Sequence, residues 1–288
     1  MSEYDFSKHV PSDVGLGERH LPSQSLDTQT NLDQIAIWTS NNLMQLKESK
    51  TDYMVFTRAQ KQFSTRLTLN NKWIERKYEG KCLGVWLQPD GRWGKNTREL
   101  CKSGYARIQM LTKLKYSGAS IEDLLHIYKQ FVRGKLEYSS VVWHSSLTEK
   151  QSKSLERCQS VALKIILNES YVSYDAACEM TGLEKLYDRR SSRCLDFGLK
   201  SVKHPQNSRF FPQNVLDENQ VNLRNREPFH VNFARTSQYK NSAIPYIQRR
   251  LNEHSQALEA SGSSGPDRQP AGGRGQAAGG QGQARRPG

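Results

Sequence analysis

Residues 82–115 read CLGVWLQPDGRWGKNTRELCKSGYARIQMLTKLK, and the spacing of apolar side chains changes within this stretch. Residues 82–87 form a short apolar run typical of a strand, and Pro89-Asp90-Gly91 has the chemistry of a turn. After Trp93, apolar side chains recur at the three- and four-residue spacing of a helix. A boundary between a strand-bearing part and a helical part is therefore predicted near residues 90–94. The apolar positions of the helix at 95–115 are Leu100, Ile108, Leu111 and Leu114.

Upstream of this boundary, the sequence predicts one helix followed by strands. Residues 27–49 place apolar side chains on one helical face. Residues 53–56 form a short apolar run, and residues 66–76 alternate on either side of Asn70-Asn71-Lys72, as the strands of a hairpin do. A helix followed by several strands predicts an α+β fold, with the helix on one face of an antiparallel sheet.

Downstream, the sequence predicts helices that begin at residues suited to capping. Ser120 with Asp123 resembles a capping box, and Thr148 and Ser173 open two further helices. The segment from Pro205 to Pro228 is predicted to be a loop. The downstream helices are predicted at 121–133, 149–167, from Ser173 to Gly182, 184–202 and 243–253.

The two ends of the chain differ from the rest in composition. Residues 255–288 hold nine of the 20 glycines and no aromatic residue. Such a segment cannot bury enough apolar surface to offset the entropy of ordering it. The sequence therefore predicts four regions: an irregular segment at 1–26, an α+β part at 27–93, a helical part at 94–254 and a disordered tail at 255–288.

Positive charge is concentrated in the middle of the chain. The whole chain carries a formal net charge of +13. Residues 47–115 contain 16 basic and six acidic residues, a net charge of +10, with aromatic residues between them. Basic residues interleaved with aromatic ones suit a polyanion that has bases to stack, and nucleic acid is the predicted partner. The alternative is an ordinary basic surface over an aromatic core.

Other classes of protein find little support. No apolar run approaches the roughly 20 residues of a membrane span, and the N-terminus lacks the pattern of a signal peptide, which predicts no membrane partner and a cytoplasmic or nuclear location. The five cysteines are widely spaced, so reduced and mostly buried thiols are expected. Neither cysteine nor histidine has the spacing of a zinc site.

The order of the motifs resembles one known family. The segments that carry the resemblance are Ile37 to Leu46, Lys50 to Phe56, the hairpin from Leu67 to Arg76, Lys81 to Val85, the set Tyr128, Val132, Leu136, Tyr138 and Trp143, the pair Leu155 and Gln159, Gly182-Leu183, Arg189-Arg190, and Tyr239 to Asn252. Over residues 27–254, this order is similar to the part that follows the catalytic aspartates in reverse transcriptases of non-LTR retrotransposons, of the jockey-like or CR1-like branch.

The resemblance implies that residues 27–93 are a remnant of the palm and residues 94–254 a helical thumb. The parent activity would be RNA-directed DNA polymerisation with two Mg²⁺ ions held by carboxylates. Glu122-Asp123 and Asp217-Glu218 do not follow an apolar strand, and Tyr4-Asp5-Phe6 lacks a second aspartate. The resemblance therefore implies that the family's fingers and most of its palm would precede Met1. We expect no cofactor in this chain and no catalysis by the chain alone.

The resemblance also implies roles for individual residues. Lys50 matches a proposed general acid, or is simply a solvated lysine. Leu83-Gly84 match the hairpin that grips the primer, or form a bulged core strand. The cations of the helix at 95–115 would contact the phosphates of a template–primer duplex, or form a solvated face. These cations are Lys95, Arg98, Lys102, Arg107, Lys113 and Lys115.

Three interpretations of the whole chain remain open at this point. It is a truncated RNA-directed DNA polymerase, a stand-alone basic module that binds nucleic acid, or a retroelement fragment without a function. The sequence does not predict an oligomeric state.

Overall fold

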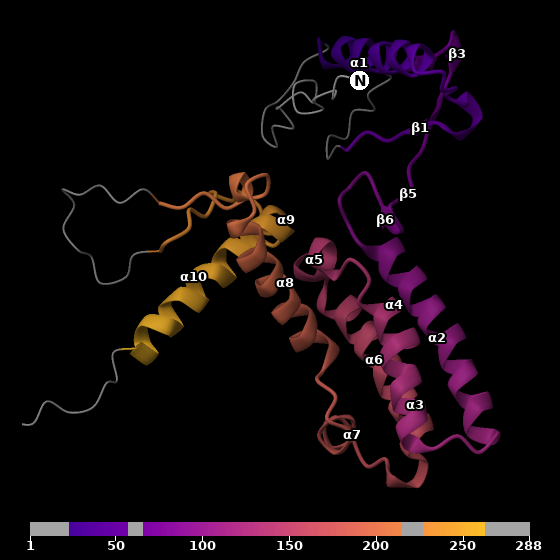
Figure 1. Cartoon of the computed structure of the whole chain (residues 1–288), viewed down its shortest axis with the longest axis vertical. Coiled ribbons are helices and arrows are strands. Elements are labelled where there is room, and N and C mark those ends of the chain that lie inside the picture. Colours follow the sequence, from indigo (N-terminus) through magenta and orange to yellow (C-terminus); the bar gives the residue numbers. More distant parts are fainter. Residues whose placement is uncertain (1–22, 57–65, 215–226, 263–288) are drawn as a thin grey trace, which may run out of the picture. The chain divides into compact units, whose positions relative to one another are not determined.

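The computed structural model describes residues 23–56, 66–214 and 227–262. The chain divides into two compact units. The first contains residues 1–194 and 241–243, and the second contains residues 195–240 and 244–288. The described secondary structure is mixed and mostly helical (Figure 1). The predicted boundary at residues 90–94 lies inside the first unit, where the last strand gives way to helices.

The strand-bearing part of the first unit begins with helix α1 (Ser23–Asn41) and a 3-10 turn η2 (Glu48–Lys50). Leu32, Ala36 and Leu46 pack on a small core of Leu67, Leu69 and Ile74. The helix was predicted to reach residue 49 but ends at Asn41. It ends there because Leu43 takes a left-handed conformation (φ 57°) and the Met44 N–H donates to the Thr39 carbonyl.

The strands form three separate pairs in the described residues, so the predicted single antiparallel sheet is wrong. β1 (Asp52–Tyr53) and β4 (Glu75–Arg76) pair in parallel. The predicted hairpin is confirmed as β2 (Thr68–Leu69) and β3 (Lys72–Trp73), joined through Asn70 and Asn71 at φ 50° and 61°. β5 (Gly80–Cys82) and β6 (Val85–Leu87) form the third pair. These strands have two or three residues each, fewer than the usual number of about five or six.

The predicted strand at 82–87 is likewise replaced by a hairpin. Leu83 and Gly84 have φ values of 44° and 86°, so both lie in the left-handed region and reverse the chain between β5 and β6. A sequence pattern of apolar residues could not distinguish this turn from a strand, because leucine rarely adopts this conformation.

The helical part of the first unit begins with α2 (Gly94–Tyr116). The next helix comprises α3 (Ile121–Ile127), the π-helical segment η3 (Tyr128–Arg133) and α4 (Gly134–Leu136). α5 (Ser140–Trp143), η4 (His144–Ser146), α6 (Glu149–Leu167), η5 (Asn168–Ser170) and α7 (Tyr174–Thr181) follow, and α8 (Leu186–Lys203) begins in this unit.

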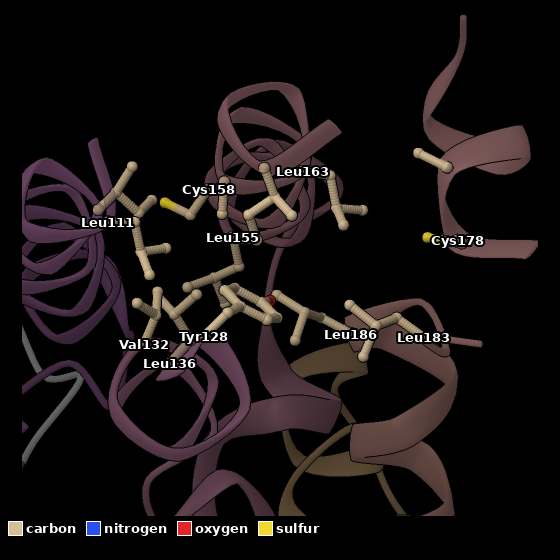
Figure 2. Close-up of a cluster of buried hydrophobic side chains, with 14 of the residues drawn as sticks. Leu111, Tyr128, Val132, Leu136, Leu155, Cys158, Leu163, Cys178, Leu183 and Leu186 are labelled. Carbon is tan, nitrogen blue, oxygen red and sulfur yellow. The ribbon is translucent and has the colours of Figure 1, made fainter. Parts of the chain in front are cut away.

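The core of the first unit lies between these helices. Figure 2 shows Leu111 of α2, Val132 of η3 and Leu155 of α6 turned toward one another. Cys158, Cys178 and Cys194 are buried as free thiols, as expected, whereas Cys82 is exposed. Nineteen of the described buried residues belong to this cluster, so among these residues it is the main source of apolar burial in the unit.

The second unit contains the remainder of α8, η6 (Ser208–Phe210), α9 (Ser237–Lys240) and most of α10 (Ala243–Gly262). α10 continues through residues 255–262, where a disordered tail was predicted, because Gln256 to Ala260 are good helix formers. α1 likewise includes residues 23–26 of the predicted irregular segment. The rest of both predicted end segments, 1–22 and 263–288, lies outside the described residues. None of the described helices combines the length and the apolar content needed to cross a membrane.

Candidate nucleic-acid interface

Helix α2 is fixed at its start by the preceding hairpin. The Lys95 N–H donates to Gln88 Oε1 (2.9 Å), and the Trp86 N–H donates to Asn96 Oδ1 (3.2 Å). Further along, Leu100, Gly104, Ile108 and Leu111 are buried. A Cβ at Gly104 would lie 2.8 Å from Leu136 Cδ2, so the glycine allows α4 to approach closely. These contacts define which side of α2 faces solvent.

The solvent face of α2 carries cations and aromatic rings but no acid. Arg98, Lys102 and Lys113 lie within about 60° of one another at 100° per residue, along about 22 Å of helix. The only acid of α2, Glu99, is half-buried and pairs with Lys95 (3.8 Å). The exposed residues of α2, which we call the α2 solvent face, are Arg98, Lys102, Tyr105, Ala106, Gln109, Met110, Lys113 and Tyr116.

The other three predicted cations of α2 have partners within the protein. Lys95 Nζ pairs with Glu79 (3.1 Å) and lies 5.0 Å from the centre of the Trp86 ring. Arg107 donates to the Phe131 carbonyl. Lys115 donates to the carbonyls of Ile165 and Ile166 in the last turn of α6. Its ammonium group there also interacts favourably with the negative end of the helix dipole. The structure therefore separates the six residues into three solvent-facing cations and three that stabilise the fold.

Leu83 and Gly84 form the turn of the β5–β6 hairpin, and this turn contacts Tyr138. The Tyr138 hydroxyl donates to the Leu83 carbonyl (2.9 Å). A Cβ at Gly84 would lie 2.9 Å from Cε1 of the same ring, so the backbone approaches Tyr138 more closely than another residue would allow. The Leu83 side chain is 89% exposed, which places an apolar group in solvent at the tip of the turn.

Lys50 lies at the end of η2, and its side chain is exposed. Its N–H donates to the Lys47 carbonyl. Among the described residues, no contact links Lys50 to the α2 solvent face.

The carboxylates of the described residues do not fit the Mg²⁺ ions that the family resemblance implies. Asp123 accepts a hydrogen bond from Ser120 Oγ (2.6 Å) as part of the α3 cap. Its neighbour Glu122 also lies in the first turn of α3. Asp217-Glu218 and Tyr4-Asp5-Phe6 lie outside the described residues. Within the described ranges, no group of three or more histidine, cysteine, aspartate or glutamate side chains could hold a metal ion.

Helix α6 carries a second row of cations that the sequence analysis did not single out. Its exposed residues are Lys150, Lys153, Arg157, Lys164 and the acid Glu149, which pairs with Lys153 (2.5 Å). The signal was present in the sequence, because positions 150, 153, 157 and 164 repeat at helical spacing on one face.

The two rows belong to neighbouring helices. α6 runs in the same direction as α2, because Gly94 lies near Gln151, Gly104 near Cys158 and Lys115 near Ile165. Arg157 also interacts electrostatically with Tyr105 of the α2 solvent face. Burial, with the neighbouring Cys158, raises the pKa of Tyr105 to about 12, so its hydroxyl remains neutral beside these cations at ordinary pH.

Comparison with known proteins adds no relative: no family model, no curated protein and no solved structure matches this chain.

Proposed function

We propose that this protein binds the backbone of a nucleic-acid duplex through the α2 solvent face. The observation that carries the proposal is the set of three exposed cations, Arg98, Lys102 and Lys113, aligned on one face without an acid. A phosphate backbone presents a regular row of negative charge, and lysine and arginine contact it without reading the base sequence. Tyr105 and Tyr116 on the same face offer flat apolar surfaces beside the cations.

We further propose that the chain corresponds to the last part of the palm and the thumb of a non-LTR reverse transcriptase. The order of motifs in the sequence supports this assignment. In this interpretation, the Leu83-Gly84 turn corresponds to the primer grip, and the α2 solvent face contacts the template–primer duplex. Since the described carboxylates do not fit the metal ions, we propose no catalytic step for this chain.

The second candidate function is a stand-alone basic module that binds nucleic acid. The cations of α6 favour it, because they extend the positive surface beyond the helix that the family resemblance singles out. Both candidates predict that the α2 solvent face binds a nucleic-acid duplex. A fragment without a function predicts only a weak attraction of nucleic acid to the whole positive surface.

Salt dependence of duplex binding tests the α2 solvent face. We expect log Kd to change linearly with log salt concentration, with a slope of about 0.9 for each phosphate contacted on a B-form duplex. Replacing Arg98, Lys102 and Lys113 together with glutamine should reduce this slope by about two to three units and weaken binding to all sequences alike. Fluorescence anisotropy with two duplexes of unrelated sequence measures both effects.

A control variant with the same loss of charge makes the test specific. Lys200, Lys203 and Arg209 are exposed cations of the second unit, and their replacement by glutamine also removes three charges. We expect this variant to retain most of the slope. Equal losses in the two variants would show that binding follows net charge and that the α2 solvent face has no special role.

A further inference from the structure

A buried carboxylate organises two arginines at the start of α8. The side chain of Glu137 is 1% exposed, and its two oxygens lie 2.8 and 3.1 Å from Arg189 Nε. Arg193 Nη1 lies 3.3 Å from Glu137 Oε2. Arg189 and Arg193 are one turn apart on α8, so a single buried acid holds two guanidinium groups side by side.

A third arginine interacts electrostatically with this pair. Arg133 is one helical turn before Glu137, whose N–H donates to the Arg133 carbonyl (3.0 Å). The Arg133 guanidinium interacts electrostatically with Arg189, Glu137 and Arg193, and burial, followed by Arg189, lowers its pKa. Its side chain is half-buried, and within the described residues it has no hydrogen-bond or ion-pair partner.

The charges of this cluster do not balance. Two guanidinium groups contact one buried carboxylate, a third interacts with it electrostatically, and the exposed Glu184 reaches only Arg189, at 3.6 Å. A partly desolvated arginine next to two others is unfavourable unless an anion joins it. The cluster is open to such an anion, because the side chains of Arg189 and Arg193 are 29% and 45% exposed.

We propose that Arg133, Arg189 and Arg193 form a binding site for a phosphate group. Guanidinium donors match the oxygens of phosphate in geometry and charge. Guanidinium groups contributed by two helices can together bind several oxygens of a tetrahedral anion. Glu137 positions two of the arginines, and Arg133 contributes donors that no other described group uses. The site is independent of the α2 solvent face and does not rest on the proposed function.

Thermal unfolding of the full chain tests the site. We expect inorganic phosphate to raise the unfolding midpoint above the value in sodium chloride of equal ionic strength, because a ligand that binds the native state stabilises it. The variant Arg133→Gln should bind phosphate about tenfold more weakly, or worse, in a titration that follows this midpoint. Arg209→Gln, which removes an exposed arginine of the second unit, should retain the full phosphate effect.

Two results separate a binding role from a structural one. Without phosphate, Arg133→Gln should be at least as stable as the natural chain, because the variant removes an unpaired cation. Arg133→Lys should recover only part of the phosphate effect, since an ammonium group lacks the forked donors. No midpoint shift beyond that in chloride, or an equal shift in Arg133→Gln, would overturn the proposal.

The source of the phosphate follows from a second measurement. If the site takes a backbone phosphate of nucleic acid, Arg133→Gln should also reduce the salt slope of duplex binding by about one unit. If the slope is unchanged while the inorganic phosphate effect is lost, the ligand is a small phosphate compound. Either result supports the site. A failure of the α2 solvent face would instead show in the Arg98, Lys102 and Lys113 variant alone.

Discussion

Gly84 is constrained by both its backbone conformation and its neighbour. Its φ of 86° disfavours any residue with a Cβ, and that Cβ would also meet the Tyr138 ring at 2.9 Å. We expect Gly84→Ala to lower the free energy of unfolding by about 1–3 kcal/mol, which urea denaturation can measure.

Gly118 provides the matched control for this prediction. It has the same φ of 86°, but a Cβ there would meet nothing within 4 Å. Gly118→Ala should therefore show the backbone effect alone, and Gly84→Ala should be the more destabilising of the two. Equal effects would show that the contact with Tyr138 contributes nothing, and the close packing of the turn would then be unimportant for stability.

Some of these residue-scale features were predictable and others were not. Ser120 and Thr148 were recognised as caps because a cap depends on residues three positions apart, and both accept the expected N–H bonds, from Asp123 and Gln151. Lys115 is predicted to contact phosphate, and in the structure it donates to carbonyls that are 50 and 51 positions away. Sequence spacing contains no information on such distant partners.

At the scale of elements, the π-helical segment η3 keeps the buried side chains of its helix on one face. Leu124, Tyr128, Val132 and Leu136 are spaced by four residues and are at most 1% exposed. In a regular α-helix each step of four residues would rotate the side chain by about 40°, and three steps would turn Leu136 away from the core. The wider turns of a π-helix remove part of this rotation.

This explanation predicts that the helix tolerates a deletion. Removing the exposed Gln130 would leave buried positions spaced by four, three and four residues, which suits a regular α-helix. We expect the deletion to change the free energy of unfolding by less than about 2 kcal/mol and to preserve a cooperative transition. Urea denaturation followed by circular dichroism measures both.

Deleting Ala106 is the comparison. Ala106 is also exposed, but it lies in the regular α-helix α2, where its loss would rotate half of the buried face by about 100°. We expect this variant to lose its cooperative transition. If the Gln130 deletion were equally damaging, the π segment would have a role other than maintaining the register of the buried face.

The helices of the first unit were largely predictable, and the strands were not. The helix at 149–167 was predicted with the bounds that α6 has, because its cap and its apolar spacing are both local. The pairing of β1 with β4 depends on contacts between Asp52 and Glu75 and between Tyr53 and Arg76, more than twenty positions apart and on either side of the β2–β3 hairpin. Alternation along one strand does not indicate which strand will be its partner.

At the scale of the whole molecule, a buried chain of hydroxyl and amide groups makes stability depend on alkaline pH. Tyr128 donates to Gln159 (2.6 Å), Gln159 donates to Tyr174 (3.0 Å), and Tyr174 donates to Glu156 (2.5 Å). Burial raises the pKa of Tyr128 and of Tyr174 well above the ordinary value of 10.0. Both side chains are therefore stable in the fold only as neutral phenols.

The sign of the effect follows from these directions. The unfolded chain loses its tyrosine protons near the ordinary pKa, while the folded chain retains them. Stability is thus fully present below about pH 10 and falls above it, by about 1.4 kcal/mol per pH unit for each fully shielded tyrosine. Urea denaturation about one pH unit below and above this value should show the loss.

Tyr128→Phe is the variant that identifies the source of the loss. It should be less stable at neutral pH, because Gln159 Oε1 loses its donor, and its stability should fall less steeply at high pH. An unchanged pH dependence would assign the alkaline loss to other groups.

The candidate interface could be predicted from the sequence only in part. Net charge and helical spacing selected α2, and Arg98, Lys102 and Lys113 do face solvent. The cluster of Arg133, Arg189 and Arg193 combines residues more than fifty positions apart, and only the packing of η3 and α4 near α8 brings them together. Charge that is spread along a sequence becomes a site only through such packing.

The capping of α8 has a consequence for the order of folding. The residue directly before Leu186 has no short polar side chain that could cap the helix. Instead, the Leu186 and Tyr187 N–H groups donate to Glu156 on α6, 30 and 31 positions earlier. The first turn of α8 is therefore completed only after α6 has formed and the intervening loop has closed, which carries an entropic penalty. We therefore expect α6, whose cap is formed by neighbouring residues, to form early in folding and the first turn of α8 to form late.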